Sequence, residues 1–410
     1  MLPLRPLLRP LEAFPFEEDG DEFLILRDPQ KITPDVQVPR GIAPLLALCD
    51  GEHTIAQMAE AAQGEDGQGV PSHLIERVLQ QADEYYLLES PRFEQFQREA
   101  THSYAQVQTR PAAFAGLSYP DEPHELSAFL QEKWDAAAQW DTQQLPGKLR
   151  GIIVPHIDFH RGGDVEALAW RTLGRESFDT IIALGIAHSG VRYPFCATLK
   201  DHETPFGTVR CDRAFVEALS ERVGPRLLAE ENAHRQEHSL EFVAVFQEFV
   251  PSLRDATLVP ILCGGFWEAL KTGRSPSEFP DIVAFCDALR DLVHEREARG
   301  ERVALVASVD GAHVGTQFGD PTKLTPTRLD EIRREDAAFW QEVEAGNTDG
   351  LHAHLARDNN ARNVDAHPAV WTLMHAFPEL RAQMLHYNQA FDARTNAVVS
   401  FASLALYESV

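Results

Sequence analysis

The sequence predicts an α/β protein, with a mixed or parallel sheet flanked by helices and a small domain before it. Three observations predict this fold class. From residue 110 onward, short apolar runs alternate with amphipathic helical segments, a pattern typical of a sheet covered on both faces. The composition changes near residue 90. The chain of 410 residues is 44% hydrophobic, which is enough for two packed cores.

The N-terminal region is expected to be a small domain over residues 1–90. Residues 22–26 are strand-like, residues 42–48 are apolar and helical, Thr54 is a candidate N-cap, and a further helix opens at residues 71–72. This layout resembles the PqqD-like peptide-binding or winged-helix modules. A generic helical cap on the larger domain is the alternative interpretation. Residues 91–109 are interpreted as a helical linker.

The region 110–410 is expected to form the larger domain. Helices are predicted at residues 125–138, 213–223, 237–250 and 326–345. The last has Thr325 as candidate N-cap and proline at its first position, with four apolar residues inward: Ile332, Phe339, Trp340 and Val343. Residues 397–402 are strand-like.

Histidine and aspartate residues follow three of the predicted strands. The runs 152–154, 180–184 and 303–307 lead into His156, into His188, and into Asp310 with His313. Ligands bind outside the carboxyl ends of strands in open α/β sheets. Imidazole and carboxylate together suit non-haem iron or zinc. We therefore expect one shared site, with His313 as a general acid/base and Asp310 orienting it or facing the metal.

Blander interpretations remain open for these residues. A core histidine bonded to the backbone is the alternative for His156 and His188, and a strand-end cap is the alternative for Asp310 and His313. Residues 234–238 also fit H-x-x-E-H, the inverted zinc-protease motif, in which His234 and His238 hold zinc and Glu237 is the base. A solvated charged face is the alternative for Glu237. His352 and His354 are expected at the surface.

Charge and cysteine content exclude several function classes. The net charge of −26 argues against non-specific nucleic-acid binding and against docking on anionic membranes. No apolar run approaches the ~20 residues of a membrane helix, and residues 1–6 do not resemble a signal peptide. The five cysteines are scattered and form no CxxC pair. We expect reduced thiols and a cytoplasmic protein.

Several sequence blocks together resemble the Memo-like family, also named AmmeMemoRadiSam system protein B. The first is RPAAFAGLSYP at residues 110–120. In the family's order follow VPH at 154–156, LGIAH at 184–188, EHSLE at 237–241, VPI at 259–261, SVDGAH at 308–313 and HP at 367–368. The resemblance covers roughly residues 110–410.

The resemblance implies a fold like that of the class III extradiol dioxygenases, which hold Fe(II). Some members bind metal through two histidines and a cysteine, and the histidines map onto His156 and His188. Val364 stands where the cysteine falls by an ungapped count, and a slip of one residue lets Asp365 supply a carboxylate. That completes a set of two histidines and one carboxylate, typical of non-haem iron. Asp310 and Asp158 are next in line for the third position.

The resemblance also places other residues near the site. His238 and Glu241 are expected to line it from a helix N-terminus, with His238 catalytic and Glu241 binding substrate. Arg161, in a loop that departs from the family pattern, is expected to hold an anionic substrate.

The expected function is a metal-dependent, dioxygenase-like oxidoreductase using Fe(II), with zinc or copper as other possible metals. Its substrate is an unidentified small molecule or peptide. The alternative is a non-catalytic partner of a radical-SAM-associated peptide or protein modification system. A zinc hydrolase is the lesser alternative.

Overall fold

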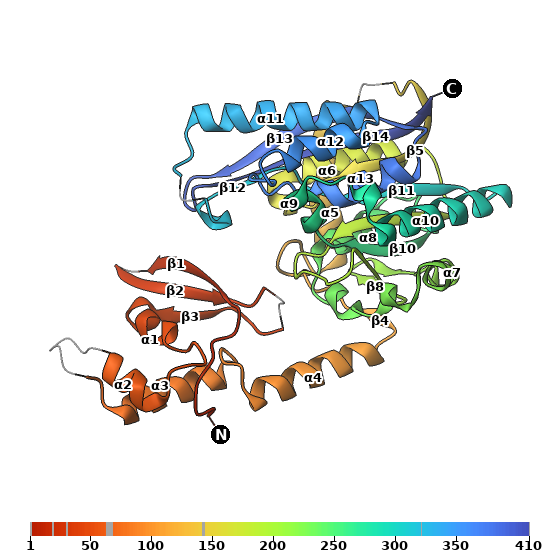
Figure 1. The fold of residues 1–410 in the computed structure, drawn as a ribbon. Helices are drawn as coiled ribbons and strands as arrows, with labels where there is room; N and C mark the ends of the chain where they lie inside the picture. The colour runs from red at the N-terminus through yellow and green to blue at the C-terminus, as the bar shows by residue number, and fades with distance from the viewer. Residues whose placement is uncertain are drawn as a thin grey trace. The chain divides into compact units, whose positions relative to one another are not determined.

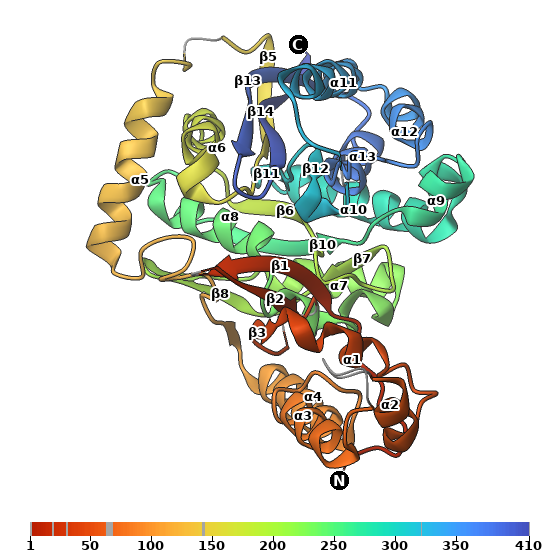
Figure 2. The same ribbon diagram turned by 90° about the vertical axis from the view of Figure 1, so that its left-hand side faces the viewer.

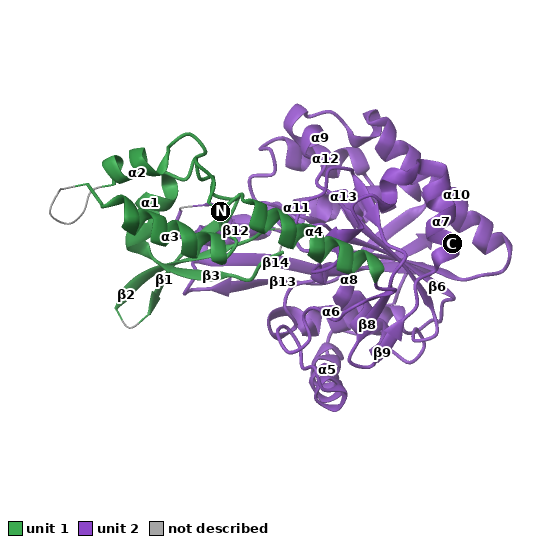
Figure 3. Cartoon of the chain, turned by 90° about the horizontal axis from the view of Figure 1, so that it is seen from below, with its two compact units in different colours: residues 1–106 green, residues 107–410 purple. Residues whose placement is uncertain are grey.

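The chain divides into two compact units, up to Gln106 and from Val107 onward (Figures 1 and 3). The computed structural model describes residues 2–18, 20–29, 32–62, 69–141, 144–320 and 322–409. The segment expected to be a helical linker, 91–109, mostly forms helix α4 (Pro91–Gln106), which belongs to the first unit.

Unit 1 contains a three-stranded antiparallel sheet followed by helices. The strands are β1 (Glu12–Glu18), β2 (Asp21–Arg27) and β3 (Val36–Pro39), in the order β1-β2-β3. After the short turn η1 (Arg40–Ile42) come α1 (Ala43–Ala47), α2 (Ile55–Ala61) and α3 (Ser72–Glu84). Thr54 caps α2, because its side chain accepts a hydrogen bond from the Gln57 amide.

Only one of the three strands of unit 1 was expected, the one that became β2. The sequence of β1 gives little signal because the strand is almost fully exposed and contains Pro15. Strand β3 has only four residues, too few for a reliable alternation.

The main sheet of unit 2 is mixed, with the order β12-β14-β5-β11-β6-β10-β7 and β13 paired to β14. Four neighbouring strands are parallel: β5 (Gly147–Val154), β11 (Val303–Ser308), β6 (Thr180–Ile186) and β10 (Thr257–Cys263). Antiparallel strands complete it: β7 (Phe195–Ala197), β12 (His313–Gly315), β13 (Leu380–Asp392) and β14 (Ala397–Ser409). A small separate sheet holds β4 (Thr109–Arg110), β8 (Asp201–Thr204) and β9 (Gly207–Val209).

Helices cover both faces of this sheet (Figure 2). Residues of one face pack with α5 (Pro123–Ala137), α6 (Phe159–Leu173) and α8 (His238–Phe249). Residues of the other face pack with α7 (Arg213–Val223), α9 (Trp267–Thr272), α10 (Pro280–Ala298), α11 (Pro326–Ala345), α12 (Thr348–Ala356) and α13 (Ala366–Ala376). Four short 3-10 turns are η2 (Pro225–Leu228), η3 (Glu231–His234), η4 (Pro276–Glu278) and η5 (Thr316–Phe318). The expected fold class is confirmed.

Side chains alternate between the two layers along each parallel strand. On β6, for example, Ile182 and Leu184 join one core while Ile181 and Ala183 join the other. Both faces are buried, which explains why these strands are continuous apolar runs in the sequence. Among the described residues, no helix is long and apolar enough to cross a membrane.

Candidate metal centre

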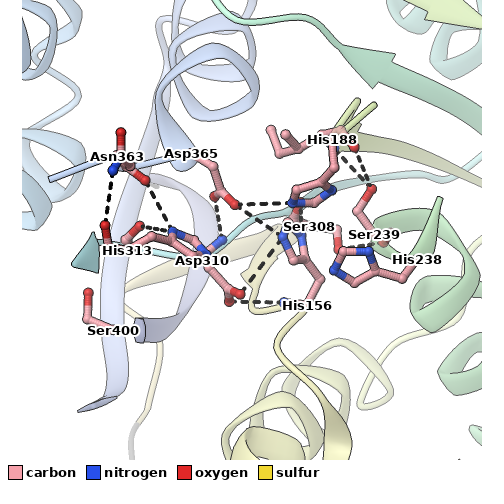
Figure 4. A network of polar contacts seen from close by, with 12 residues as sticks. His156, His188, His238, Ser239, Ser308, Asp310, His313, Asn363, Asp365 and Ser400 are labelled. Atoms are coloured by element: carbon pink, nitrogen blue, oxygen red, sulfur yellow. Dashed lines mark hydrogen bonds and ion pairs between the residues drawn. The ribbon is translucent and has the colours of Figure 1, made fainter. Parts of the chain in front are cut away.

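The candidate site lies where three neighbouring parallel strands end. Strands β5, β11 and β6 are adjacent, so the residues that follow them, His156, Asp310 and His188, emerge at one edge of the sheet. His238, the first residue of α8, and Asp365, just before α13, complete the group (Figure 4).

His156 is held with one ring nitrogen bonded and the other directed into the site. Its Nδ1 lies 2.9 Å from the carbonyl oxygen of Ser308, and since a carbonyl only accepts, Nδ1 carries the proton. Its Nε2 lies 3.2 Å from Asp365 Oδ2 and 3.8 Å from Asp310 Oδ2. The imidazole is 1% exposed, so Nε2 faces a buried site, where it can bind a metal ion once it has lost its proton.

His188 is oriented in the same way by a carboxylate. Its Nδ1 lies 2.9 Å from Glu237 Oε1, and its backbone amide donates to Glu237 Oε2 at 2.9 Å. Its Nε2 lies 3.7 Å from Asp365 Oδ2. A carboxylate behind a ligand histidine is the arrangement found around protein-bound metals. His188 is the most exposed residue of the three-histidine group, with 30% of its side chain accessible.

The carboxylate of Asp365 points toward both histidines, while the neighbouring Val364 is buried in the core. Its Oδ1 accepts from the Asp310 amide at 2.7 Å, so the second oxygen, Oδ2, faces the imidazoles. The loop is fixed by Asn360, whose side chain bonds both the amide and the carbonyl of Val364 at 2.9 Å. Asn360 has a positive φ of 55°, which asparagine tolerates better than most residues.

His238 forms a third corner of the site. Ring nitrogens of His156, His188 and His238 lie within 4.8 Å of one another, as atoms that share one metal ion can. Nδ1 of His238 is 3.2 Å from Glu237 Oε1, the oxygen that also binds His188. Glu237 therefore bonds His188 and lies in close contact with His238.

The electrostatics of the site follow from burial and pairing. Burial disfavours the charged form of His188, but the carboxylates of Glu237 and Asp365 outweigh it and raise the pKa to about 10. Burial and the charge of His188 lower the pKa of His238 to about 3. Burial alone would raise the pKa of Glu237, but the imidazoles of His188 and His238 hold this pKa well below its usual range. The site thus keeps Glu237 ionised beside a neutral His238.

In the view of Figure 4, His313 lies beyond Asp365 from His238, and the Asp310 carboxylate lies below Asp365, facing His156. Asp310 Oδ1 accepts from the His156 amide at 3.2 Å, and Oδ2 lies 3.8 Å from His156 Nε2. Of the two expected roles for Asp310, orienting His313 or facing the metal, this contact favours the second. The Nδ1 of His313 lies 3.1 Å from the carbonyl oxygen of Asn363 and 3.2 Å from that of Gly311. Nδ1 is therefore the donor, and Nε2 of His313 is left as a proton acceptor.

Comparison with known proteins decides the family. A sequence profile described as Memo-like protein matches residues 110–405. The chain belongs to the Memo-like family. It is 26% identical to a MEMO1 family protein of Aquifex aeolicus over 98% of this chain and 100% of that protein. It is 27% identical to one from Thermus thermophilus over 86% of this chain and 99% of that protein.

Two residues expected to bind substrate have other contacts in this Memo-like protein. Arg161 is exposed and donates to the Ala390 carbonyl at 3.1 Å. Glu241 is fully buried, and both its oxygens are used: they accept from Arg110, from the amides of Ala113 and Phe114, and from the Tyr119 hydroxyl. A substrate would have to break this network to reach Glu241, so its geometry is that of a scaffold.

The H-x-x-E-H interpretation is wrong. The motif needs two histidines one turn apart on a single helix, but His234 ends η3 while His238 begins α8. The Nε2 of His234 instead contacts the Cys196 carbonyl at 3.1 Å. Glu237 is not solvated either, since it is 2% exposed. The expected surface position of His352 is also wrong: it is 3% exposed and its Nδ1 lies 3.1 Å from His367 Nε2.

Sequence reasoning named Glu237 only as a base of the H-x-x-E-H motif, and it missed that Glu237 and Ser308 orient the histidines. Ser308 ends β11, accepts from His156 through its carbonyl, and donates from Oγ to the Ser239 carbonyl at 2.6 Å. One signal was available for Glu237: it stands at the N-cap of α8 beside a site histidine. Nothing in the sequence marks the Ser308 carbonyl, because a backbone acceptor exists at every position.

Proposed function

We propose that this Memo-like protein is a non-haem iron oxidoreductase of the dioxygenase-like kind, with His156, His188 and Asp365 as the residues that hold Fe(II). The observation that carries the proposal is the convergence of Asp365 Oδ2 on the Nε2 atoms of His156 and His188, at 3.2 and 3.7 Å. Donors that share one ion at ~2.1 Å lie about this far apart. Two imidazoles and one carboxylate leave positions open for substrate and oxygen.

The residues present fit such an ion. His156 Nε2 and Asp365 Oδ2 are buried and lie 3.2 Å apart, and among the described residues neither makes a hydrogen bond to a group outside this site. Buried polar atoms of this kind carry a desolvation cost unless something satisfies them, and a cation would satisfy both. The hard oxygen of Asp365 favours Fe(II) or Mn(II) over Cu(I). His238 is placed to join the set, which would also suit zinc.

The chain's own groups supply proton handling and orientation. Iron bound in this set would supply the redox chemistry that activates oxygen toward an organic substrate. His313, with Nδ1 bonded to backbone carbonyls, is placed to accept a proton at Nε2. Asp310 holds the backbone of His156. Glu237 and the Ser308 carbonyl bond the Nδ1 atoms of His188 and His156, which leaves the Nε2 atoms of both rings for the ion.

Metal content after anaerobic purification and dialysis tests the proposal. The parent should retain about one iron per chain, and the double variant His156→Ala, His188→Ala should retain none. A matched control, His124→Ala, His294→Ala, removes two exposed histidines of the same unit and should retain iron. Asp365→Ala should weaken Fe(II) binding, and Asp365→Cys should shift preference toward copper or zinc. Iron content that is equal in the two double variants contradicts the proposal.

A second candidate function is that of a binding partner in a radical-SAM-associated peptide or protein modification system. Unit 1 favours it through a groove of about 370 Å³ lined by β3 and α3. Among the described strands, β3 pairs only with β2, so its other edge is open for an added peptide strand. Tyr85, 58% exposed, lines this groove.

Selection of a random dodecapeptide phage library against the full-length chain tests this second function. Enriched peptides should lose binding to Tyr85→Ala. They should keep binding to Trp267→Ala, which removes an aromatic side chain of similar exposure, 64%, from unit 2. No enrichment, or enrichment that ignores Tyr85, contradicts peptide binding in the groove. Binding that survives loss of the metal ligands would separate the two functions.

A further inference from the structure

A buried arginine joins two segments that border the site. Arg110 is 1% exposed and uses all three guanidinium nitrogens. Nε donates to the His234 carbonyl at 2.6 Å, Nη2 to the Glu237 carbonyl at 2.7 Å, and Nη1 to Glu241 Oε2 at 2.5 Å and to the carbonyl of its neighbour Pro111 at 3.0 Å. Each long-range partner is more than 120 residues away in sequence, so these bonds form only in the folded protein.

Two of these bonds hold the turn that leads into α8. The carbonyls of His234 and Glu237 mark its two ends, and the side chain of Glu237 leaves it to bind His188 Nδ1, the His188 amide and the Ser239 amide. Arg110 therefore fixes the backbone from which Glu237 reaches His188.

The partner of the arginine, Glu241, holds the opposite segment. It lies one turn after His238 on α8 and accepts from the amides of Ala113 and Phe114, at 2.9 and 2.8 Å, and from the Tyr119 hydroxyl. The loop 111–119 is thereby closed against α8, and the Phe114 ring lies 5.6 Å from the His238 ring. The Arg110–Glu241 ion pair thus holds both the loop 111–119 beside His238 and the backbone of Glu237, whose carboxylate bonds His188.

We propose that the Arg110–Glu241 ion pair is a positioning element of the metal centre, which fixes Glu237 and His238 without touching the bound ion. The inference rests on the proposed metal function. It makes residues 110–119 part of the site, although none of them supplies a ligand. A lysine at position 110 keeps the charge but has no planar fork to reach both carbonyls and Glu241 together.

Cobalt(II), used as a spectroscopic probe of the full-length chain, tests this inference. Arg110→Lys should bind Co(II) 10- to 100-fold more weakly than the parent, the loss typical for supports of metal ligands, and its visible spectrum should change. Arg150→Lys is the matched control. Arg150 is also buried and also pairs with carboxylates, those of Glu297 and Glu408. It lies in β5 and lines a cavity that contains none of the site residues.

The control should lower thermal stability and leave Co(II) affinity within about twofold. Equal losses of affinity in both variants, or no loss in folded Arg110→Lys, overturn the inference. If Arg110→Lys does not fold, Tyr119→Phe decides, because it deletes one hydroxyl that donates to Glu241. That variant should weaken Co(II) binding about threefold, and unchanged affinity overturns the inference.

A metal-free measurement separates this inference from the proposed function. In ¹⁵N-histidine-labelled apoprotein, the Nδ1–H proton of His188 should give a protected, downfield signal because it is bonded to Glu237. The signal should weaken in Arg110→Lys and persist in Arg150→Lys. If the parent binds no metal and the His188 signal weakens in Arg110→Lys, only the metal function is contradicted. If the parent binds metal and the signal is unchanged in Arg110→Lys, only the positioning role is contradicted.

Discussion

Glu237 and Glu166 are both buried glutamates of unit 2, at 2% and 1% exposure, yet their surroundings are opposite. Glu237 accepts hydrogen bonds from His188 Nδ1, the His188 amide and the Ser239 amide. Glu166, on α6, has no hydrogen-bond partner for either oxygen among the described residues. The two differ in partners and hardly at all in burial.

Their charge states differ for that reason. Two imidazoles hold the pKa of Glu237 well below its usual range. Burial, together with the charges of Asp310, Asp158 and Asp164, raises the pKa of Glu166 well above its ordinary value of 4.5. Burial penalises a charge in both places, but only at Glu237 is the penalty offset by donors. Glu237 is thus a carboxylate that orients ligands, whereas the surroundings of Glu166 favour its neutral form.

The largest expected effect comes from removing Glu237. Glu237→Ala leaves the His188 amide, the Ser239 amide and an imidazole without their acceptor, so metal-free protein should lose ~3–5 kcal/mol of stability. Urea denaturation checks this, and Fe(II) affinity should fall with it. A variant as stable as the parent would mean that water replaces the carboxylate.

A smaller effect with a characteristic pH dependence is expected for Glu166→Gln. Below pH 4.5 the carboxyl is neutral in both folded and unfolded chains. As pH rises further, the unfolded chain releases this proton while the folded chain keeps it. The stability contribution of Glu166 therefore falls by up to ~1.4 kcal/mol per pH unit until pH passes the raised folded pKa.

Urea denaturation of parent and Glu166→Gln at pH 5, 6, 7 and 8 measures the pH-dependent contribution of Glu166 to stability. The free energy of unfolding of the variant should increase relative to that of the parent as pH rises. The cost of burying the amide adds a constant that does not change with pH. A difference that does not vary with pH would show that Glu166 ionises normally and is not the counterpart of Glu237 that we describe.

The smallest effect should come from Asp164→Asn. This change removes one of the three carboxylates that raise the pKa of Glu166 but leaves its burial intact. The pH dependence assigned to Glu166 should shift only slightly downward, and this shift should shrink in high salt. A larger shift would mean that charge, more than burial, keeps Glu166 neutral.

The sequence predicts elements whose determinants are local. Helix α11 was expected at 326–345 and begins and ends there, because Thr325 caps it and Pro326 suits its first turn. The parallel strands were recognisable because both of their faces are buried. The convergence of His156 and His188 followed from strand ends that share one edge.

What the sequence could not predict depends on distant partners. Arg110 and Glu241 are separated by 131 residues, and no local pattern distinguishes this buried pair from surface charges. The same holds for Glu237, for which a solvated face was the alternative interpretation, and for His352, whose partner is His367. Whether a polar residue is buried, and which group it bonds, depends on tertiary contacts that a local sequence pattern does not contain.

The pairing of β14 with β5 has a consequence for the speed of folding. Residues 404–409 pair with residues 147–153, so the strand that leads to His156 gains its second neighbour only from a segment some 250 residues further along. Contacts across such long separations pay the entropy of closing a large loop before any stabilisation returns. During synthesis, the edge of β5 that pairs with β14 therefore stays unpaired until β14 has been made, and other chains can reach it. The opposite edge can be covered earlier by β11, and completion of the sheet around His156 is expected to be among the last and slowest steps.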